Sequence, residues 1–336
     1  MPRKGWRREG NRRPFRYFDT RGVRIRDAQT IERLDKLAIP PAWRDVWISP
    51  NVNAKLQATG VDAAGRKQYL YHPDFRAQRE SEKFDSLIRF AEKLPDLRAA
   101  MAEDMKLEPN DPRRVCAVAL RLINLAWFRI GSDRYAKTAR TYGVTTLRRS
   151  HVQVRGKRVS FRFTAKGRIK VRTALVDEEL AASIRDLLAT PGTRLFRYEH
   201  EGRLTNLTDR RLNDYIKEKM GNGFSGKDFR TWGGTLLAAI AFAEHGPVDG
   251  AGEQKRVIAA VMRGVAEKLG NTPAVCRASY VAPAVVEQYL DGRTIDDFRP
   301  RHLRVVTARE IGLDVEELAT LSLLRSHRIR RARRAA

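Results

Sequence analysis

The sequence of 336 residues contains only two cysteines, Cys116 and Cys276, which lie far apart in the chain. We expect both to be reduced, packed thiols of a cytosolic protein, and no cysteine–histidine grouping has the spacing of a zinc site. No apolar run approaches about 18 residues, so no membrane span is expected. The extreme N-terminus is basic and lacks an apolar segment, which argues against a secretory signal.

Nucleotide-binding signatures are also missing. The chain has no G-x-x-x-x-G-K-[ST] sequence, so nothing in it supports an ATP-driven activity. The run from Gly221 to Gly226 fits G-x-G-x-x-G, but a dinucleotide site needs that run after a strand and an acid about 20 residues further on. Here a predicted helix precedes the run, and the residues at that distance end another predicted helix. We interpret the run as a flexible loop.

Acidic residues are scarce relative to basic ones. The 40 Asp and Glu stand against 66 Lys and Arg, which gives a formal net charge of +26. Such an excess indicates a polyanionic partner, because each phosphate that a cation neutralises releases condensed counterions. Ribosomal and membrane-surface proteins can be equally basic, although the charge favours nucleic acid. Apolar residues make up 42% of the chain, enough for a globular core.

A change of pattern near residues 76–82 predicts two domains, residues 1–80 and 81–336, joined by a flexible segment. The first dozen residues are rich in arginine, and we expect them to be mobile. The rest of the first domain is predicted to be mostly β-structure with one short helix. The expected strands are 46–49, 55–59 and 67–71, the expected turn is 62–65, and the expected helix is 31–37.

The second domain is predicted to be mainly helical. Asp111 as N-cap and Pro112 at the first helical position predict a helix that reaches Arg129 and stops at Gly131. Alternating apolar residues over 152–171 predict a three-stranded meander with Lys166 at a hairpin tip. The remaining predicted helices are 204–220, 229–244, 253–269, 282–290 and 315–326, followed by an arginine-rich tail over 328–334.

Four side chains are candidates for chemistry, and each alone has an ordinary structural explanation. Arg129 has apolar neighbours, and a buried arginine needs an anion, which an internal salt bridge could supply. Arg230 falls in the first turn of a predicted helix, where a bound phosphate would explain a cation better than surface charge does. Lys166 could be an ordinary exposed turn residue. Tyr280 could be a core aromatic, although small and polar neighbours suit an accessible hydroxyl.

In combination and in this order, the residues resemble the type IB DNA topoisomerases, in particular the small poxvirus-like and bacterial branch. The resemblance covers nearly the whole chain, from Ile39 to Leu290. Each matching stretch is short, but their order and spacing are specific. The stretches are Ile39–Trp43, Gly65–Tyr71, Phe128–Gly131, Thr141–Leu147, Phe163–Gly167, Lys227–Thr231 and Leu269–Tyr280.

The resemblance implies a role for each candidate. Tyr280 would attack a DNA phosphodiester to form a 3′-phosphotyrosine, Arg129 and Arg230 would clamp the phosphoryl oxygens, and Lys166 would protonate the departing 5′ oxygen. Asn271 stands where the family usually has a histidine, and an amide can only donate a neutral hydrogen bond to a phosphoryl oxygen. The positions that match DNA-contacting residues are Gln68, Tyr69, Tyr71 and Tyr135.

The resemblance also implies an α+β architecture that closes as a clamp around duplex DNA. A small β-rich N-terminal DNA-binding domain would face a mainly helical catalytic domain with a three-stranded β insert. We expect contacts mainly to phosphates, neither ATP nor a metal as cofactor, and a monomer in a bacterial cytoplasm, associated with the nucleoid. Three cationic groups would supply the charge that a metal otherwise provides.

Two alternatives remain on the sequence alone. A tyrosine recombinase shares the arginine, lysine and tyrosine chemistry, but it would usually begin with a helical domain instead of a strand-rich one. A non-catalytic, architectural DNA-binding protein would have the same charge, but it would not need Tyr280, Lys166 and two arginines at these places.

Overall fold

The computed structural model describes residues 4–10, 14–299 and 312–335, and it divides into two compact units, Met1–Lys83 and Phe84–Ala336. The division falls three residues from the boundary expected from the sequence. The first unit contains β1 (Trp6–Glu9), β2 (Arg16–Phe18), α1 (Ala28–Lys36), β3 (Arg44–Ile48), β4 (Leu56–Val61), β5 (Lys67–Tyr71) and the start of α2 (Pro73–Asp104).

The first unit is built around an antiparallel sheet of five strands in the order β2-β1-β3-β4-β5. Strand β1 lies inside this sheet, so the expectation that the first dozen residues are mobile is wrong for the described residues 4–10; residues 1–3 and 11–13 lie outside the described part. Arg8 explains the error. Its guanidinium is buried and donates to the carbonyl oxygens of Ile39, Pro40 and Trp43 at 2.9, 3.0 and 2.9 Å.

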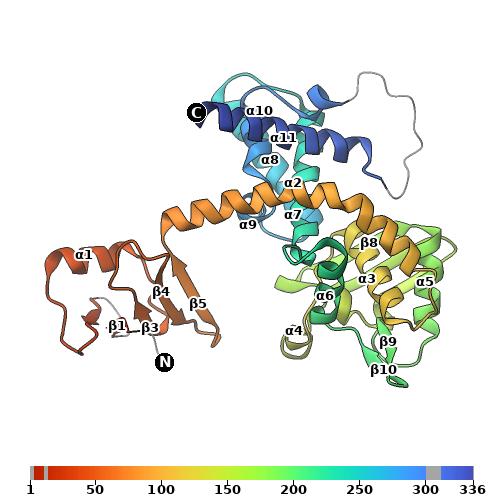
Figure 1. Ribbon diagram of the computed structural model, residues 1–336, viewed down its shortest axis with the longest axis horizontal. Helices are drawn as coiled ribbons and strands as arrows, with labels where there is room; N and C mark the ends of the chain where they lie inside the picture. Colours follow the sequence, from red (N-terminus) through yellow and green to blue (C-terminus); the bar gives the residue numbers. More distant parts are fainter. Residues whose placement is uncertain (1–3, 11–13, 300–311, 336) are drawn as a thin grey trace. The chain divides into compact units, whose positions relative to one another are not determined.

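The connection between the units is a helix. Helix α2 runs without interruption from Pro73 to Asp104 and therefore crosses the boundary (Figure 1). The expectation of a flexible segment near residues 76–82 is therefore wrong, because these residues are helical. The sequence there is polar and lacks an apolar stripe, but Gln78 and Glu82, one helical turn apart, join by a hydrogen bond of 2.9 Å.

The second unit is mainly helical and has two small sheets. Strands β6, β7 and β8 form an antiparallel three-stranded sheet, and β9 pairs with β10. Its elements after α2 are α3 (Pro112–Ala126), α4 (Asp133–Thr138), β6 (Val152–Arg155), β7 (Arg158–Thr164), β8 (Lys170–Val176), α5 (Glu178–Ala189), β9 (Arg197–His200), β10 (Arg203–Asn206), α6 (Asp209–Met220), α7 (Gly226–His245), α8 (Ala251–Leu269), α9 (Pro273–Ser279), α10 (Pro283–Leu290) and α11 (Val315–Ala335), together with short 3₁₀ turns.

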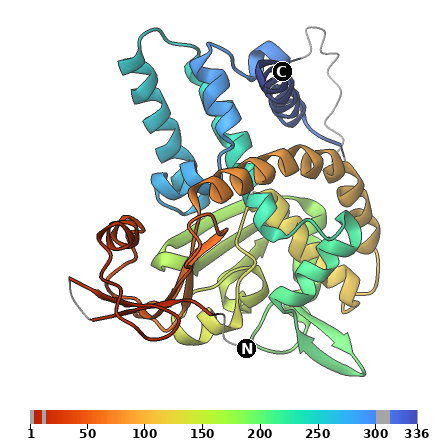
Figure 2. The same ribbon diagram turned by 60° about the vertical axis from the view of Figure 1, so that its left-hand side comes forward.

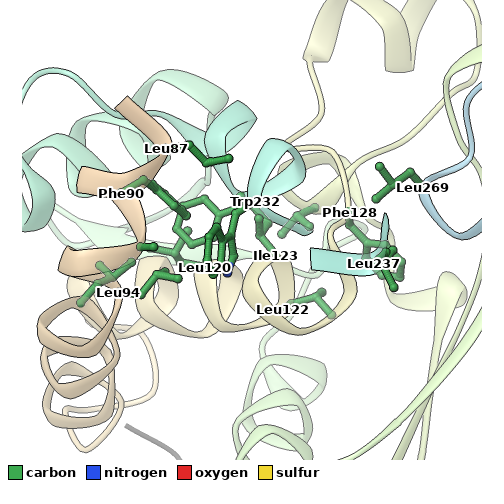
Figure 3. Packing of buried hydrophobic residues seen from close by; sticks show 14 of the residues in the cluster. Leu87, Phe90, Leu94, Leu120, Leu122, Ile123, Phe128, Trp232, Leu237 and Leu269 are labelled. Carbon is green, nitrogen blue, oxygen red and sulfur yellow. The ribbon is translucent and has the colours of Figure 1, made fainter. Parts of the chain in front are cut away.

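The core of this unit lies where α2, α3 and α7 meet. Phe90 of α2, Leu120 and Ile123 of α3 and Trp232 of α7 pack side by side (Figure 3). Phe90 also meets Phe229 edge to face, with ring centroids 5.0 Å apart. Because α7 carries Arg230, this packing fixes the helix on which one candidate residue stands.

Three predicted helices differ clearly from the structure. The helix expected over 315–326 continues as α11 to Ala335, so the arginine-rich tail expected over 328–334 is helical. Helix α3 ends at Ala126, because Trp127 turns into the left-handed region at φ 51° and its N–H donates to the Ile123 carbonyl oxygen at 2.8 Å. Arg129 therefore follows the helix and does not end it. The helix expected from residue 204 begins at Asp209 with Thr208 as its N-cap, and residues 203–206 form strand β10 instead. Leu204 and Thr205 fit a strand as well as a helix, which short patterns do not distinguish.

The C-terminal helix α11 packs against α10 and α7 (Figure 2). Asp314 and Glu317 cap it reciprocally, as their spacing predicts, with backbone donors at 2.7 and 3.2 Å. Glu317 also accepts two hydrogen bonds from Arg98 of α2, at 2.8 and 2.7 Å, and one from Trp232 Nε1 at 3.1 Å. One buried carboxylate therefore ties α2, α7 and α11 together.

Candidate active site

Arg129 lies in the extended segment that leaves α3. This backbone pairs with the segment after Gly143: the Val144 N–H donates to the Arg129 carbonyl oxygen at 2.9 Å, and the Thr145 N–H donates to that of Ile130 at 2.7 Å. A Cβ on Gly143 would lie 2.5 Å from the Arg129 carbonyl oxygen, so only glycine allows this approach. The segment 141–147 thus fixes the backbone of Arg129.

Arg230 stands in the first turns of α7. Ser225 is the N-cap of that helix, and Asp228 completes the capping box by accepting from the Ser225 N–H at 2.8 Å. Arg230 is only 4% exposed. It donates to the carbonyl oxygens of Trp127 and, at 2.7 Å, Leu269.

Both guanidinium groups bind the C-terminal end of α8. Arg230 donates to the Leu269 carbonyl oxygen, and Arg129 donates to that of Gly270 at 2.8 Å. A helix leaves its last carbonyl oxygens without intrahelical donors, and this end of its dipole is negative, so cations are favoured there. The end of α8 therefore brings two arginines from distant segments together.

These two cations have no carboxylate partner among the described residues, where their hydrogen bonds go to neutral oxygens. Burial, and then repulsion by Arg230, lower the pKa of Arg129 to about 10. Burial also lowers the pKa of Arg230, while the nearby Tyr280 opposes that shift. An anion bound between the two groups would relieve both penalties, so the arrangement suits a phosphate.

Asn271 follows directly after the end of α8. Its Oδ1 accepts a hydrogen bond of 2.5 Å from Arg129 Nη2. Its Nδ2 is buried and has no partner among the described residues. The amide oxygen therefore orients Arg129, and the amide nitrogen remains available to donate a hydrogen bond.

Tyr280 caps the C-terminus of the short helix α9, which begins with Thr272 as N-cap and Pro273 at its first position. The Tyr280 N–H donates to the Cys276 carbonyl oxygen at 2.9 Å. The Arg230 guanidinium lies over the Tyr280 ring, 5.1 Å from its centroid. The tyrosine is half-buried, and its ring contacts the arginine expected to act with it.

Helix α7 also contacts the Tyr280 backbone directly. Thr235 Oγ1 donates to the Tyr280 carbonyl oxygen at 3.3 Å and accepts from the Ala282 N–H at 3.1 Å. A Cβ on Gly234 would lie 2.6 Å from the same carbonyl oxygen, so glycine is required for this approach. Arg230 and Gly234 are one turn apart, and α7 therefore holds both an arginine and the tyrosine segment.

Lys166 lies in the 3₁₀ turn between β7 and β8, where the Ala165 N–H donates to the Ile169 carbonyl oxygen at 2.8 Å. Gly167, at φ 79°, makes the turn possible. The Lys166 side chain is exposed.

One cavity of about 360 Å³ contains all four candidates from separate segments: Arg129, Lys166, Arg230 and Tyr280 line it together. Tyr135 of α4, 40% exposed, lines it as well. Sequence reasoning did not single out Asn213, Ser225 or Lys227, which also line it. The Ser225-x-x-Asp228 spacing was the available signal for the loop that carries two of them.

The candidate DNA-contacting residues of β5 divide between two faces of the strand. Tyr69 and Tyr71 are 51% and 40% exposed and stack with ring centroids 6.3 Å apart. Gln68 points to the other face, because side chains alternate along a strand, and it donates to Asp62 Oδ2 at 2.8 Å. Tyr69 and Tyr71 therefore present an open aromatic surface, while Gln68 holds the neighbouring turn.

The described residues contain no group of three or more His, Cys, Asp or Glu side chains placed to hold a metal ion. None of their helices is both long and apolar enough to cross a membrane.

Comparison with known proteins identifies the family. The model of a family described as eukaryotic DNA topoisomerase I, catalytic core, matches residues 72–297. The chain belongs to the type IB DNA topoisomerases. A second model, described as the N-terminal domain of bacterial DNA topoisomerase IB, matches residues 14–62 of this topoisomerase. Arg129, Lys166, Arg230 and Tyr280 all fall within the matched catalytic core.

Viral topoisomerases are among its relatives. DNA topoisomerase 1B of Acanthamoeba polyphaga mimivirus is 32% identical over 291 residues, which cover 84% of this chain and 86% of that protein. DNA topoisomerase I of Monkeypox virus is 23% identical over 277 residues, or 80% and 85% of the two chains. DNA topoisomerase 1B of Vaccinia virus (strain Copenhagen) is 22% identical over the same length and shares.

Proposed function

We propose that this topoisomerase relaxes supercoiled DNA by cutting one strand through a covalent bond to Tyr280 and then resealing it. The main support for this proposal is the cavity lined by Tyr280, two arginines without acidic partners and an exposed lysine. A second cavity of about 460 Å³ shares Arg129 and Arg230 but is lined by neither Lys166 nor Tyr280. The chemistry of the four groups in the first cavity fits transfer of a phosphodiester between a DNA oxygen and a tyrosine oxygen.

The first step is attack of the Tyr280 oxygen on phosphorus. The O–P bond to tyrosine forms, the phenol proton leaves to solvent, and the bond from phosphorus to the 5′ oxygen breaks. Arg129 and Arg230 neutralise the non-bridging oxygens, and such preorganised donors contribute roughly 3–4 kcal/mol each. The planar guanidinium fork suits this task, and it keeps its charge at neutral pH even where burial lowers the pKa of Arg129 to about 10.

Lys166 supplies a proton to the departing 5′ oxygen, because an alkoxide is a poor leaving group. Its position in an exposed turn that lines the cavity supports this role. Asn271 donates a neutral hydrogen bond to a phosphoryl oxygen through the amide nitrogen that has no partner among the described residues. In resealing, the 5′ hydroxyl attacks phosphorus and returns its proton to Lys166 as the bond to tyrosine breaks.

The phosphotyrosine conserves the energy of the phosphodiester, so the proposed cycle needs no ATP, and the three cations take the place of a metal. We further propose that a monomer closes around duplex DNA and binds mainly its phosphates. Tyr69, Tyr71 and Tyr135, each at least 40% exposed, support the aromatic part of this DNA-binding surface. Gln68 contributes indirectly, because its hydrogen bond to Asp62 holds the turn before β5. The expected setting is a bacterial cytoplasm, at the nucleoid.

The test is relaxation of a supercoiled plasmid that carries no recombination site, with neither ATP nor divalent metal added. The proposal expects relaxation and a covalent adduct that survives denaturant. Relaxation that requires a defined site and a partner site would support a recombinase. Tight binding to every DNA tested, with neither relaxation nor adduct, would support an architectural protein and refute the proposal.

A further inference from the structure

The larger cavity, of about 460 Å³, adjoins the catalytic one, and we call it the β8 cavity. It shares Arg129, Tyr142 and Arg230 with the catalytic cavity, but neither Lys166 nor Tyr280 lines it. Its other walls are mainly the end of α3, the strand β8 and the last residues of α8, to which the proposed cleavage assigns no role. A volume in this range suits a small organic molecule, since ligand cavities measure about 300–1,000 Å³.

The β8 cavity extends away from the catalytic arginines. At one end, Ile169 and the Arg129 guanidinium lie beside Gly270, where an added Cβ would be 3.5 Å from Ile169 Cγ2 and 3.8 Å from Arg129 Nη1. From there the chain lines the cavity as far as Leu175, six residues further along. A strand covers roughly 20 Å over that length, at ~3.3 Å per residue. The cavity can therefore hold a molecule that meets the arginines with one end only.

Apolar and aromatic side chains form one wall of the β8 cavity without filling it. Leu125 is 38% exposed, and Trp127, Val171 and Leu175 are half-buried. The Trp127 indole lies against α7, where a Cβ on Gly233 would come within 2.4 Å of the ring. Because glycine leaves room for the indole there, Trp127 is a fixed aromatic part of the wall. Such a wall favours a flat, apolar ring, which stacks on aromatic side chains.

The rest of the lining is strongly basic. Lys170 donates to the neutral Thr164 hydroxyl at 3.1 Å, and within the described ranges Arg172 has no carboxylate partner. Both Nη atoms of Arg230 are bonded to carbonyl oxygens, but its buried Nε has no partner among the residues that the structure describes. An anionic group at the arginine end would supply an acceptor that the protein does not. Against the one acid, Glu267, stand the basic side chains Arg129, Lys170, Arg172, Arg230 and Lys268.

We propose that the β8 cavity binds a small aromatic anion, with its charged group at Arg129 and Arg230 and its ring along Trp127 and β8. The bound anion occupies the arginines that the DNA phosphate needs, so it inhibits formation of the covalent adduct. The inhibition rests on the proposed function, whereas the binding does not. DNA affinity comes from many phosphates along the duplex, so the ligand slows cleavage and leaves DNA binding nearly unchanged.

Binding is tested by calorimetric titration of the full chain with 2-naphthoate. We expect a Kd below about 1 mM, which is a modest affinity for a ligand of this size. Decanoate, an aliphatic anion, should bind about 2–10-fold more weakly, because it cannot stack on the aromatic wall. The matching cation, 2-naphthylmethylammonium, should not bind.

Variants of β8 locate the bound molecule. Thr173 lines the cavity and is half-buried, so Thr173→Phe should fill the space and weaken 2-naphthoate binding by about 10-fold or more, while Thr173→Val, of nearly unchanged size, should bind normally. Arg172→Gln removes one lining charge and should weaken binding by about 2–5-fold. Its matched control is Arg162→Gln, because Arg162 lies directly opposite on β7 and does not line the cavity.

Inhibition is measured as single-turnover adduct formation with saturating 2-naphthoate, beside DNA affinity under the same conditions. The rate should fall by about 10-fold or more in the unmodified protein and in Arg162→Gln, because occupied arginines cannot bind the DNA phosphate. Thr173→Phe should form the adduct at the same rate with and without the ligand.

Equal binding of 2-naphthoate by Thr173→Phe and the unmodified protein would overturn the inference, as would no binding at all or equal binding of the cation. If Thr173→Phe does not fold, equal binding by Arg172→Gln and Arg162→Gln overturns it instead. Bound ligand that leaves the cleavage rate unchanged refutes the inhibition. If the unmodified protein forms no adduct even without ligand while Thr173→Phe loses binding, the proposed function fails and the binding site stands.

Discussion

Replacing Thr235 by valine tests whether α7 positions Tyr280, the proposed nucleophile. The Thr235 side chain has no exposed surface, and its hydroxyl is the shared partner of the Tyr280 carbonyl oxygen and the Ala282 N–H. Valine keeps nearly the same shape, so Thr235→Val leaves the packing in place and removes both hydrogen bonds. The segment that carries Tyr280 then loses its polar anchor to the helix that carries Arg230.

The magnitude follows from these two contacts. A buried polar group left without its partner costs about 1–3 kcal/mol, and the longer contact, 3.3 Å, places this pair toward the lower end. Since 1.36 kcal/mol corresponds to tenfold in rate, a loss of about 1–2 kcal/mol should slow cleavage by about 5-fold to 30-fold. A displacement of ~1 Å at a reacting group can cost about 100-fold, so the expected slowing corresponds to a smaller shift of Tyr280.

The assay is single-turnover formation of the covalent adduct, with DNA affinity measured separately under the same conditions. Thr235→Ser keeps the hydroxyl and should retain most of the rate, whereas Thr235→Val should lose rate at unchanged affinity. If valine cleaves as fast as threonine, the hydroxyl does not position Tyr280 and the reasoning is wrong. If serine is as slow as valine, the lost methyl packing is responsible instead.

Three further outcomes are expected. Asn271→His should retain cleavage activity and Asn271→Ala should lose much of it, because alanine cannot donate to a phosphoryl oxygen; a cleavage time course in which alanine equals the unmodified protein would contradict this. Burial and Arg230 lower the pKa of Arg129 to about 10, so the DNA affinity that Arg129 adds over an Arg129→Gln variant should be complete near neutral pH and shrink as pH rises through 10; an advantage unchanged above that pH would count against it. Glu317→Ala should lower the free energy of unfolding by about 3–5 kcal/mol in urea titrations, since Arg98 would remain buried without its partner, and Glu317→Gln should cost less; equal losses would argue against the ion pair.

Local sequence patterns gave four candidates for the site, each with an ordinary structural explanation, and the family resemblance singled them out together. Arg129, Lys166, Arg230 and Tyr280 each lie in a short stretch with its own cues, such as the turn at Gly167 or the helix start before Arg230. The structure brings all four to one cavity. Their order along the chain predicted that they act together, and the roles assigned to them remain predictions.

Contacts between distant segments could not be predicted in this way. The end of α8 holds both arginines through backbone carbonyl oxygens, which carry no sequence signature. The contacts of Gly234 and Thr235 with the Tyr280 carbonyl oxygen likewise depend on how α7 packs against the segment after α9. Arg8 shows the same limit in the fold, because a buried arginine that binds carbonyl oxygens looks like a solvated one in the sequence.

Covalent trapping with a Tyr280→Phe variant tests the central claim most directly. Phenylalanine keeps the ring beneath the Arg230 guanidinium and removes only the proposed nucleophilic oxygen. The account predicts that the unmodified protein forms a denaturant-resistant adduct with a nicked or short duplex, and that Tyr280→Phe binds the same DNA equally well and forms none. An adduct with Tyr280→Phe would show that another residue attacks the phosphate, and the proposed mechanism would be wrong.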